Sequence, residues 1–304
     1  MKGGAAMTAV QQTVAQKIDG RKLARELRAR LKHHVQVLVE DHKILPALAV
    51  VLVGDDPASH IYVANKQKAA EKTGIRSIVH KLPRETSQDE LLKLIKKLND
   101  DKKINGILVQ LPLPRQIDTA TILRAISPAK DVDGLTVENA GRLASGLNGL
   151  FPCTPLGCLA LIRTVRPHLS GLHAVVVGRS NLVGKPMAQL LLRENCTVTV
   201  VHSRTPQLAT LTKMADIVVV AAGKQGLIKA DAIKPGAVVI DVGINRMPDG
   251  TLTGDVDFGA VSSVAGAITP VPGGVGPMTI AYLLANTVAA ACRQNELTCP
   301  DLKN

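Results

Sequence analysis

The sequence predicts an α/β protein of two domains, in which parallel strands are covered by helices. Apolar runs of strand length alternate with amphipathic segments of helical period along the whole chain, which is typical of this class. The runs are continuous rather than alternating, as in strands buried on both faces. The 304 residues suffice for two domains, and a glycine-rich stretch over 139–155 contains the expected boundary. We therefore expect a three-layer α/β domain over 1–150 and a second α/β domain over 151–276.

The first half of the chain begins with a helix and then alternates strands and helices. Leu23, Leu27 and Leu31 recur at helical spacing in the first helix, and Ser59 is a plausible cap for the second. The predicted helices are 18–41, 59–72, 88–99 and 119–126, the strands are 47–53, 75–82 and 104–111, and a turn follows at 131–134.

The second half repeats this alternation and ends in a long helix. The predicted helices are 156–165, 187–193 and 278–294, the strands are 175–177, 197–201, 217–221, 237–241 and 267–269, a short hairpin is expected at 251–255, and a proline- and glycine-rich loop at 270–277.

The turn at 178–186 follows a buried strand and opens a helix, so it is a candidate phosphate site. A Walker A loop is excluded because five residues separate Gly178 from Gly184 and Pro186 replaces the magnesium-binding hydroxyl. Ser180 occupies the middle glycine position of the dinucleotide fingerprint, but the strand–turn–helix topology of a Rossmann-like unit remains. A plain βαβ unit without nucleotide is the alternative.

The next strand end indicates which dinucleotide would fit. It carries Ser203 and Arg204 where an NAD-binding unit has a carboxylate, and Arg179 lies in the first turn. Hydroxyl and guanidinium groups suit a 2′-phosphate. The sequence therefore predicts NADP as the cofactor.

Composition limits the other partners. The net charge of +12 raises the question of nucleic acid, but the basic residues are dispersed and only 1% of residues are aromatic, so anionic small molecules are favoured. The five cysteines form no CxxC pair, which predicts neither a metal site nor a disulfide framework and implies a reducing compartment. No run of 18 apolar residues and no signal peptide is found, so we expect a cytoplasmic protein without a membrane partner.

Four polar residues are expected at one edge of the first sheet. Tyr62 and Lys66 share a helix face, Gln110 ends the third strand, and Asp133 lies in the turn beyond it. A buried lysine can exchange protons near neutral pH, which favours general acid–base chemistry. The alternative is that Lys66 is a surface lysine and Asp133 only stabilises a turn.

The loop 270–277 also has two possible roles. It is either a site that lets a flat ring approach the backbone or an interdomain hinge.

Taken in order, six motifs resemble the bifunctional methylenetetrahydrofolate dehydrogenase/methenyltetrahydrofolate cyclohydrolase family over about residues 17–295. The motifs are Ser59-x-x-Tyr62-Val63-x-x-Lys66, Gly106 to Pro114, Lys130-Asp131-Val132-Asp133-Gly134, Val177 to Pro186, Asp241-Val242-Gly243-Ile244 and Pro270 to Thr279.

The resemblance implies a role for each matching residue. Lys66 would be the catalytic lysine of the cyclohydrolase, Tyr62 would pack against the folate, Gln110 would hydrogen-bond Lys66, and Asp133 would bind the pterin-like ring. Pro272, Gly273 and Gly274 would line the folate site, while Gly178, Arg179, Ser180, Ser203 and Ile244 would contact NADP. The family also implies a homodimer and a C-terminal helix, 277–304, that returns to the first domain.

The implied activity is NADP-dependent oxidation of 5,10-methylenetetrahydrofolate to the methenyl form, followed by hydrolysis to 10-formyltetrahydrofolate. A non-catalytic NADP-sensing or nucleic-acid-binding protein on the same scaffold would be expected to lack Lys66, Gln110 or Asp133. A dehydrogenase of another small substrate would leave the loop 270–277 without a purpose.

Overall fold

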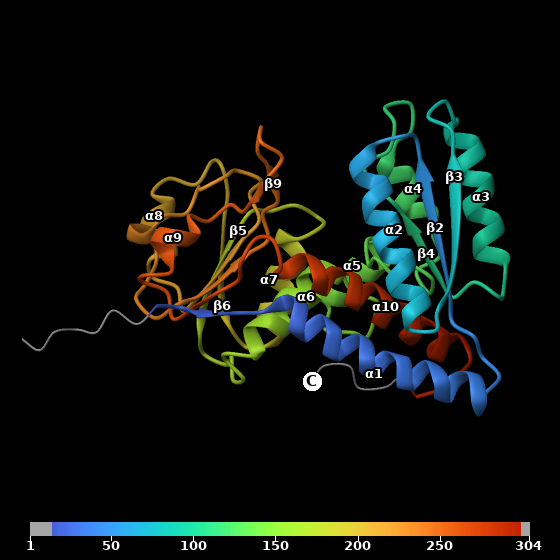
Figure 1. The fold of residues 1–304 in the computed structure, drawn as a ribbon, viewed down its shortest axis with the longest axis horizontal. Coiled ribbons are helices and arrows are strands. Elements are labelled where there is room, and N and C mark those ends of the chain that lie inside the picture. Colours follow the sequence, from blue (N-terminus) through green and yellow to red (C-terminus); the bar gives the residue numbers. More distant parts are fainter. Residues whose placement is uncertain (1–13, 299–304) are drawn as a thin grey trace, which may run out of the picture.

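The computed structural model describes residues 14–298, which form two lobes, each built around a parallel sheet (Figure 1). Helices α1 (Gly20–Glu40), α6 (Cys153–Arg163) and α10 (Val275–Gln294) lie below and between the lobes in that view. The predicted α/β class with two parallel sheets is confirmed.

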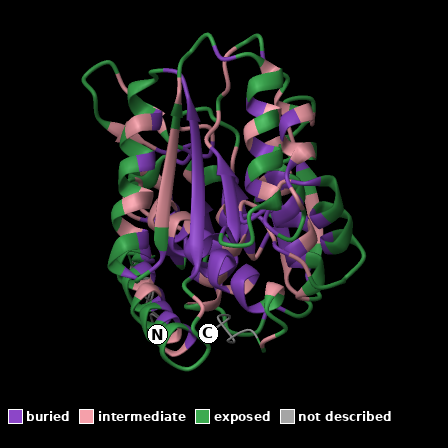
Figure 2. Cartoon of the chain, turned by 90° about the vertical axis from the view of Figure 1, so that its right-hand side faces the viewer, coloured by how far each residue is buried: buried purple, intermediate pink, exposed green. Residues whose placement is uncertain are grey.

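The smaller sheet has three parallel strands in the order β3-β2-β4. All seven residues of the central strand β2 are buried, and Figure 2 shows the sheet flanked by helices with exposed outer faces. Because the chain leaves β2 for β3 on one side and returns to β4 on the other, a crevice is expected outside the carboxyl ends of β2 and β4. The elements of this region are β2 (Ala47–Val53), α2 (Pro57–Lys72), β3 (Arg76–Leu82), α3 (Gln88–Asp100), β4 (Gly106–Val109), α4 (Thr119–Ala125) and α5 (Val137–Ala144).

The larger sheet has six parallel strands in the order β1-β11-β8-β7-β5-β6. Here the chain reverses at β5, which lies between β6 and β7 and so marks a second crevice. The elements are β1 (Gln16–Lys17), β5 (His173–Val177), α7 (Gly184–Arg193), β6 (Thr197–Val201), α8 (Leu208–Thr212), β7 (Ile217–Val220), a 3₁₀ turn (Ala230–Ala232), β8 (Val238–Asp241), β9 (Asn245–Arg246), β10 (Leu252–Thr253), α9 (Phe258–Val261) and β11 (Ala267–Ile268).

Helix α10 returns to the smaller lobe, as the family resemblance implied. It packs along α1 and α6 and reaches β2, β4 and α2. By length and composition this helix could cross a membrane, but 72% of its apolar window is buried inside the protein. Its packing against α1 and α6 therefore accounts for its apolar sequence.

Several predicted elements need correction. Helix α5 overlaps the glycine-rich stretch 139–155, where no helix was predicted, and α10 begins at Val275, inside the predicted loop 270–277. A proline in the first turn is compatible with a helix, so Pro277 does not delay its start. The hairpin predicted at 251–255 is formed by β9 and β10 instead, which pair Leu252 with Arg246. Strand β1 joins the larger sheet although it precedes α1 in the chain.

Candidate functional site

Lys66 and Gln110 meet at the crevice of the smaller sheet. Lys66 lies on α2, the helix that follows β2, and its Nζ donates a hydrogen bond to Oε1 of Gln110 at 2.9 Å. Gln110 follows β4, and its backbone amide continues the ladder to the Val51 carbonyl. Its Nε2 donates to the Leu111 carbonyl at 2.7 Å, which fixes Oε1 toward the lysine. The hydrogen bond that the resemblance implied between these two side chains is therefore present.

The charges of Lys66 and Asp133 interact across this crevice. Both side chains are half-buried, and loss of water around their charged ends is the largest cause of the shift in each pKa. Burial lowers the pKa of Lys66, and the Asp133 carboxylate opposes that shift. Burial raises the pKa of Asp133, and Lys66 in turn opposes that shift. Both pKa values move toward neutrality, so this pair is suited to proton transfer.

The structure adds Cys153 to this group. Its thiol is buried at the start of α6, donates to the Val132 carbonyl at 3.2 Å, and interacts with both Asp133 and Lys66. Burial raises the pKa of the Cys153 thiol, so it is neutral at physiological pH. Sequence reasoning missed this residue because a single cysteine, about 20 positions from Asp133, carries no spacing signal.

Tyr62 and Ser59 precede Lys66 on α2. Tyr62 lies one turn before Lys66 and is 39% exposed, so its ring is available to a ligand. Ser59 is not the helix cap that the sequence predicted. Asp56 is the cap, and its carboxylate accepts from both the amide and the hydroxyl of Ser59 at 2.8 and 2.7 Å.

The loop before α10 is a close backbone contact with the start of α1. A Cβ at Gly20 would lie 1.8 Å from the Gly274 carbonyl oxygen, and the Arg21 amide donates to the Gly273 carbonyl at 3.2 Å. Gly273 has a φ of +109°, which favours glycine. Pro272 remains exposed beside it. The loop therefore presents an exposed proline on a rigid, glycine-dependent backbone.

The turn after β5 lies at the second crevice and is tightly packed. A Cβ at Gly178 would lie 2.2 Å from the Ala221 carbonyl after β7, and one at Gly184 would lie 2.2 Å from the Gly178 carbonyl. Ser180 Oγ accepts from the amides of Val183 and Gly184, at 3.1 and 3.4 Å. The candidate phosphate site depends on free amides at the start of this helix, whereas two of these amides are hydrogen-bonded to Ser180.

The remaining residues predicted to bind NADP follow β5, β6 and β8 of the same sheet. Gly178 donates to the Val201 carbonyl at 2.8 Å, which aligns the ends of β5 and β6, so Arg179 and Arg204 lie in turns that follow adjacent strands. Both arginines and Ser203 are exposed. Ile244 follows β8 and is 50% exposed, which leaves an apolar surface near the loops after β7 and β8. Exposed guanidinium and hydroxyl groups after β5 and β6, with an apolar side chain after β8, are groups that suit NADP.

Two buried carboxylates fix the loops on which Ile244 lies. Asp241 accepts from the amides of Gly243, Asp255 and Val256, each at 3.0 Å. Asp255 accepts from the amides of Ala222 and Gly223, at 2.7 and 2.8 Å. Burial raises the pKa of Asp241 to about 6. The sequence singled out the motif that begins at Asp241 but gave no reason for its carboxylate, which the structure supplies.

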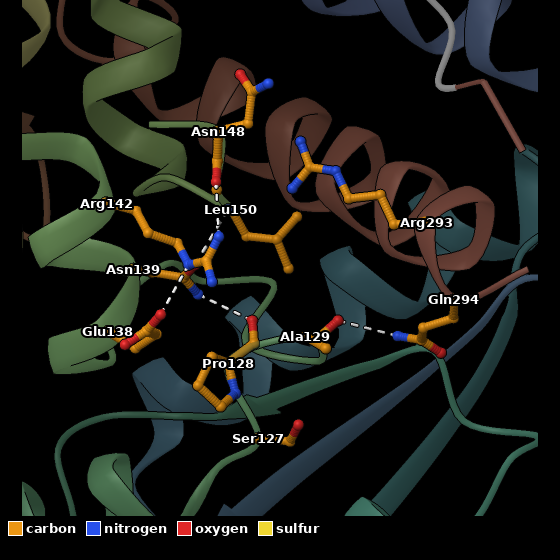
Figure 3. Close-up of a pocket in the computed structure, with 11 residues that line it drawn as sticks. Ser127, Pro128, Ala129, Glu138, Asn139, Arg142, Asn148, Leu150, Arg293 and Gln294 are labelled. Carbon is orange, nitrogen blue, oxygen red and sulfur yellow. Dashed lines mark hydrogen bonds and ion pairs between the residues drawn. The ribbon is translucent and has the colours of Figure 1, made fainter. Parts of the chain in front are cut away.

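A cavity of about 630 Å³ lies elsewhere, beyond the C-terminal part of α10 (Figure 3). Its walls include Glu138, Arg142, Leu150 and Arg293, and Gln294 there donates to the Ala129 carbonyl at 2.9 Å. None of the predicted site residues lines it. The cavity is therefore separate from the group formed by Lys66, Gln110 and Asp133.

Comparison with known proteins agrees with this geometry. The model of the tetrahydrofolate dehydrogenase/cyclohydrolase catalytic domain matches residues 18–133, and that of the NAD(P)-binding domain matches residues 152–295. The bifunctional protein FolD of Dinoroseobacter shibae is 58% identical over 293 residues, which cover 94% of this chain and 98% of the relative.

Solved structures agree as well. The bifunctional FolD methylenetetrahydrofolate dehydrogenase/cyclohydrolase of Campylobacter jejuni has a TM-score of 0.90 and 48% identity, covering 93% of this chain and all of the other. A Trypanosoma brucei methylenetetrahydrofolate dehydrogenase-cyclohydrolase, complexed with NADP cofactor and an inhibitor, has a TM-score of 0.88 and 40% identity, covering 92% and 98%. On these matches, which span both lobes, the chain belongs to the tetrahydrofolate dehydrogenase/cyclohydrolase family.

Proposed function

We propose that the crevice at Lys66 serves both reactions of this family, the NADP-dependent oxidation of 5,10-methylenetetrahydrofolate and the hydrolysis of the methenyl product to 10-formyltetrahydrofolate. The observation that carries the proposal is the Lys66–Gln110 hydrogen bond beside Asp133, at the switch point of the smaller sheet. The family match over both lobes supports the same pair of activities.

In the hydrolytic step, Lys66 moves protons and Gln110 orients it. Water adds to the methenyl carbon, and the C–N bond to one ring nitrogen breaks, so a proton must leave the water and another must reach that nitrogen. Because burial lowers the pKa of Lys66, its Nζ can give and take a proton without a large energy penalty. Gln110 Oε1 accepts a hydrogen bond from one N–H of the Lys66 Nζ. The rest of the Lys66 Nζ is thereby directed toward the substrate.

In the oxidative step, the chain binds and aligns two rings rather than supplying an acid. Bound NADP⁺ would accept the hydride of the methylene carbon. Arg179, Ser203 and Arg204 are proposed to hold the 2′-phosphate, with Gly178 and Ser180 forming the turn against the pyrophosphate and Ile244 packing on the apolar part. Asp133 is proposed to hold the pterin-like ring, with Tyr62 and residues 272–274 lining the folate site. Alignment of bound reactants is the main source of rate in such a step.

The activity is tested with purified protein, NADP⁺ and 5,10-methylenetetrahydrofolate. NADPH formation and the subsequent decay of the methenyl absorbance are followed separately. The proposal requires both signals to depend on the protein. NADPH formation without accelerated methenyl decay would remove the hydrolytic half of the proposal.

A pH prediction follows from the Lys66–Asp133 pair. The Asp133 carboxylate raises the pKa of Lys66, so Asp133→Asn should lower that pKa further and the ammonium should be lost at lower pH. The Lys66-dependent limb of the pH–rate profile for methenyl hydrolysis should move toward acid. The measurement is kcat against pH at saturating substrate. A limb that stays in place or moves toward alkali would contradict the assigned interaction.

We further propose two domains, one formed by residues 1–150 together with 277–304 and the other by residues 151–276. Strand β1 of the first segment nevertheless pairs with the larger sheet. Cytoplasmic location is proposed on Cys153, Cys158 and Cys196, which are buried free thiols suited to a reducing compartment. A homodimer is proposed through the edge strand β6, where Val200 is 40% exposed and Met214 lies nearby.

The dimer proposal predicts a solution mass twice the 32.1 kDa of one chain, measured by light scattering at micromolar concentration. Val200→Lys would bury a charge at the interface, so it should yield monomers. Phe258→Lys changes a comparably exposed apolar residue away from β6 and should leave the dimer intact. A monomeric wild type would refute the assembly.

A further inference from the structure

Asn286 is a buried polar side chain in the middle of the otherwise apolar helix α10. It is 7% exposed, and a buried amide costs stability unless it is hydrogen-bonded. Its Nδ2 donates to the Val132 carbonyl at 2.8 Å and to the Phe151 carbonyl at 2.9 Å. Val132 directly precedes Asp133, and Phe151 lies two residues before Cys153. One amide thus joins the two segments whose side chains face Lys66.

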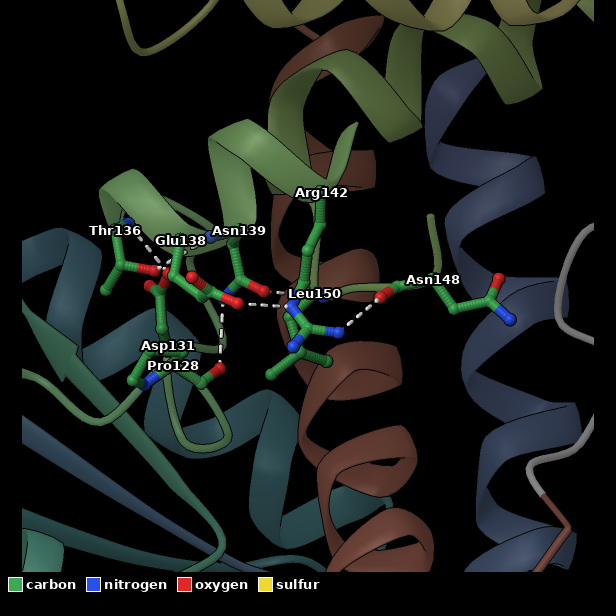
Figure 4. A network of polar contacts seen from close by, with 8 residues as sticks. All are labelled: Pro128, Asp131, Thr136, Glu138, Asn139, Arg142, Asn148 and Leu150. Atoms are coloured by element: carbon green, nitrogen blue, oxygen red, sulfur yellow. Dashed lines mark hydrogen bonds and ion pairs between the residues drawn. The ribbon is translucent and has the colours of Figure 1, made fainter. Parts of the chain in front are cut away.

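The turn that carries Asp133 is held on its other side as well. The Asp131 carboxylate accepts from the amide of Thr136 at 2.8 Å and from Nδ2 of Asn139 at 2.9 Å (Figure 4). A Cβ at Gly134 would lie 2.3 Å from the Phe151 carbonyl carbon, so the turn also presses directly on the segment before α6. With Asp131 anchored to α5, the contact from α10 determines how Asp133 sits relative to Cys153.

We propose that Asn286 is a positioning residue, which fixes Asp133 and Cys153 at set distances from Lys66 and so links α10 to the proton-transfer group. This rests on the proposed role of Lys66 and Asp133. No described hydrogen bond joins Asn286 to Lys66 or to the Asp133 side chain, but its Nδ2 also donates to Sγ of Cys153 at 3.6 Å. The titratable neighbours of Lys66 are Asp133 and Cys153, and Asp133 also faces Asp131. Helix α10 starts directly after the loop 270–274 proposed to line the folate site, so one rigid helix joins that loop to the Asp133 turn.

The test compares Asn286→Leu with Thr287→Val, a matched control one residue along α10. Thr287 is fully buried, and among the described residues its hydroxyl bonds only to the Leu283 carbonyl of its own helix, at 2.8 Å. In Asn286→Leu, kcat for methenyl hydrolysis should fall by about 10- to 100-fold, the size expected when reacting groups are displaced by about an ångström. Its pH–rate limb should also move toward acid, as in Asp133→Asn. Thr287→Val should keep the wild-type profile even where its melting temperature falls equally.

Two further measurements separate positioning from general damage. The shift should not grow when Asn286→Leu is combined with Asp133→Asn, because both remove the same interaction with Lys66. Titration of isotopically labelled lysine by NMR, with Lys66 assigned through Lys66→Met, reports its pKa without any assay of activity. If Asn286→Leu does not fold, Asn286→Ser retains one donor and takes its place. An unmoved Lys66 titration in a folded variant, or additive shifts in the double variant, would overturn the proposal. A wild type that hydrolyses no methenyl substrate would instead count against the proposed function.

Discussion

Lys66→Met should reduce methenyl hydrolysis by about 10²- to 10⁴-fold, because a positioned acid or base contributes that much to such a step. Methionine keeps most of the length and the apolar stem but removes the ammonium that donates to Gln110. Hydride transfer depends mainly on alignment, so NADPH formation should decline less. Methenyltetrahydrofolate should therefore accumulate as a product when both signals are followed in the same reaction.

The matched control for this change is Lys68→Met. Lys68 lies two residues further along α2 and is exposed, so its loss alters the charge of the helix but not the crevice. Its two activities should remain at wild-type levels. Methenyl hydrolysis that persists at the wild-type rate in Lys66→Met would show that another group transfers the proton.

Replacing both Arg179 and Arg204 by alanine should greatly weaken the use of NADP⁺. Each charge-assisted hydrogen bond to a phosphate contributes on the order of 1.5–3 kcal/mol, so each loss should raise the Michaelis constant about 10- to 150-fold. Ser180 occupies the amides at the start of α7, which leaves more of the recognition to these side chains. The constant for NAD⁺, which lacks the 2′-phosphate, should change little.

The matched control is Lys213→Ala, which removes an exposed cation that precedes β7. Lys213 lies at the opposite end of that strand from Ala221, which packs against Gly178 of the turn after β5. Lys213→Ala should leave both Michaelis constants unchanged. Equal catalytic efficiency of the wild type with NADP⁺ and NAD⁺ would contradict the 2′-phosphate assignment, and so would a double arginine variant that loses both cofactors alike.

The long elements were predictable because burial on both faces produces continuous apolar runs, as in β2, and helix faces repeat every three to four residues, as in α1. The two-residue strands β1 and β9 are too short for either signal: β1 forms by pairing with the distant strand β11, and β9 by pairing with β10 in a local hairpin. Helix α5 was missed because the glycines of the stretch 139–155 suggested a loop, whereas the Thr136 cap and the Asp131 carboxylate stabilise its first turn.

The candidate site was predictable only where strand ends locate it. The order of strands and helices predicted that Lys66, Gln110 and Asp133 share one edge, and motif resemblance suggested their roles. Cys153 and Asn286 were not predictable, because their importance arises from contacts with residues 20 or more positions away. The use of the α7 amides by Ser180 depends on the backbone conformation of the turn, which the residue types alone do not determine.

The central claim is that one crevice serves both reactions, and competition between the two folate substrates tests it most directly. Methenyl hydrolysis is measured with increasing 5,10-methylenetetrahydrofolate and no oxidised cofactor, while calorimetry gives the dissociation constant of the methylene compound under the same conditions. A shared crevice predicts purely competitive inhibition, with an inhibition constant equal to that dissociation constant. Hydrolysis that continues unchanged when the methylene compound saturates the protein would show two separate folate sites and contradict the account.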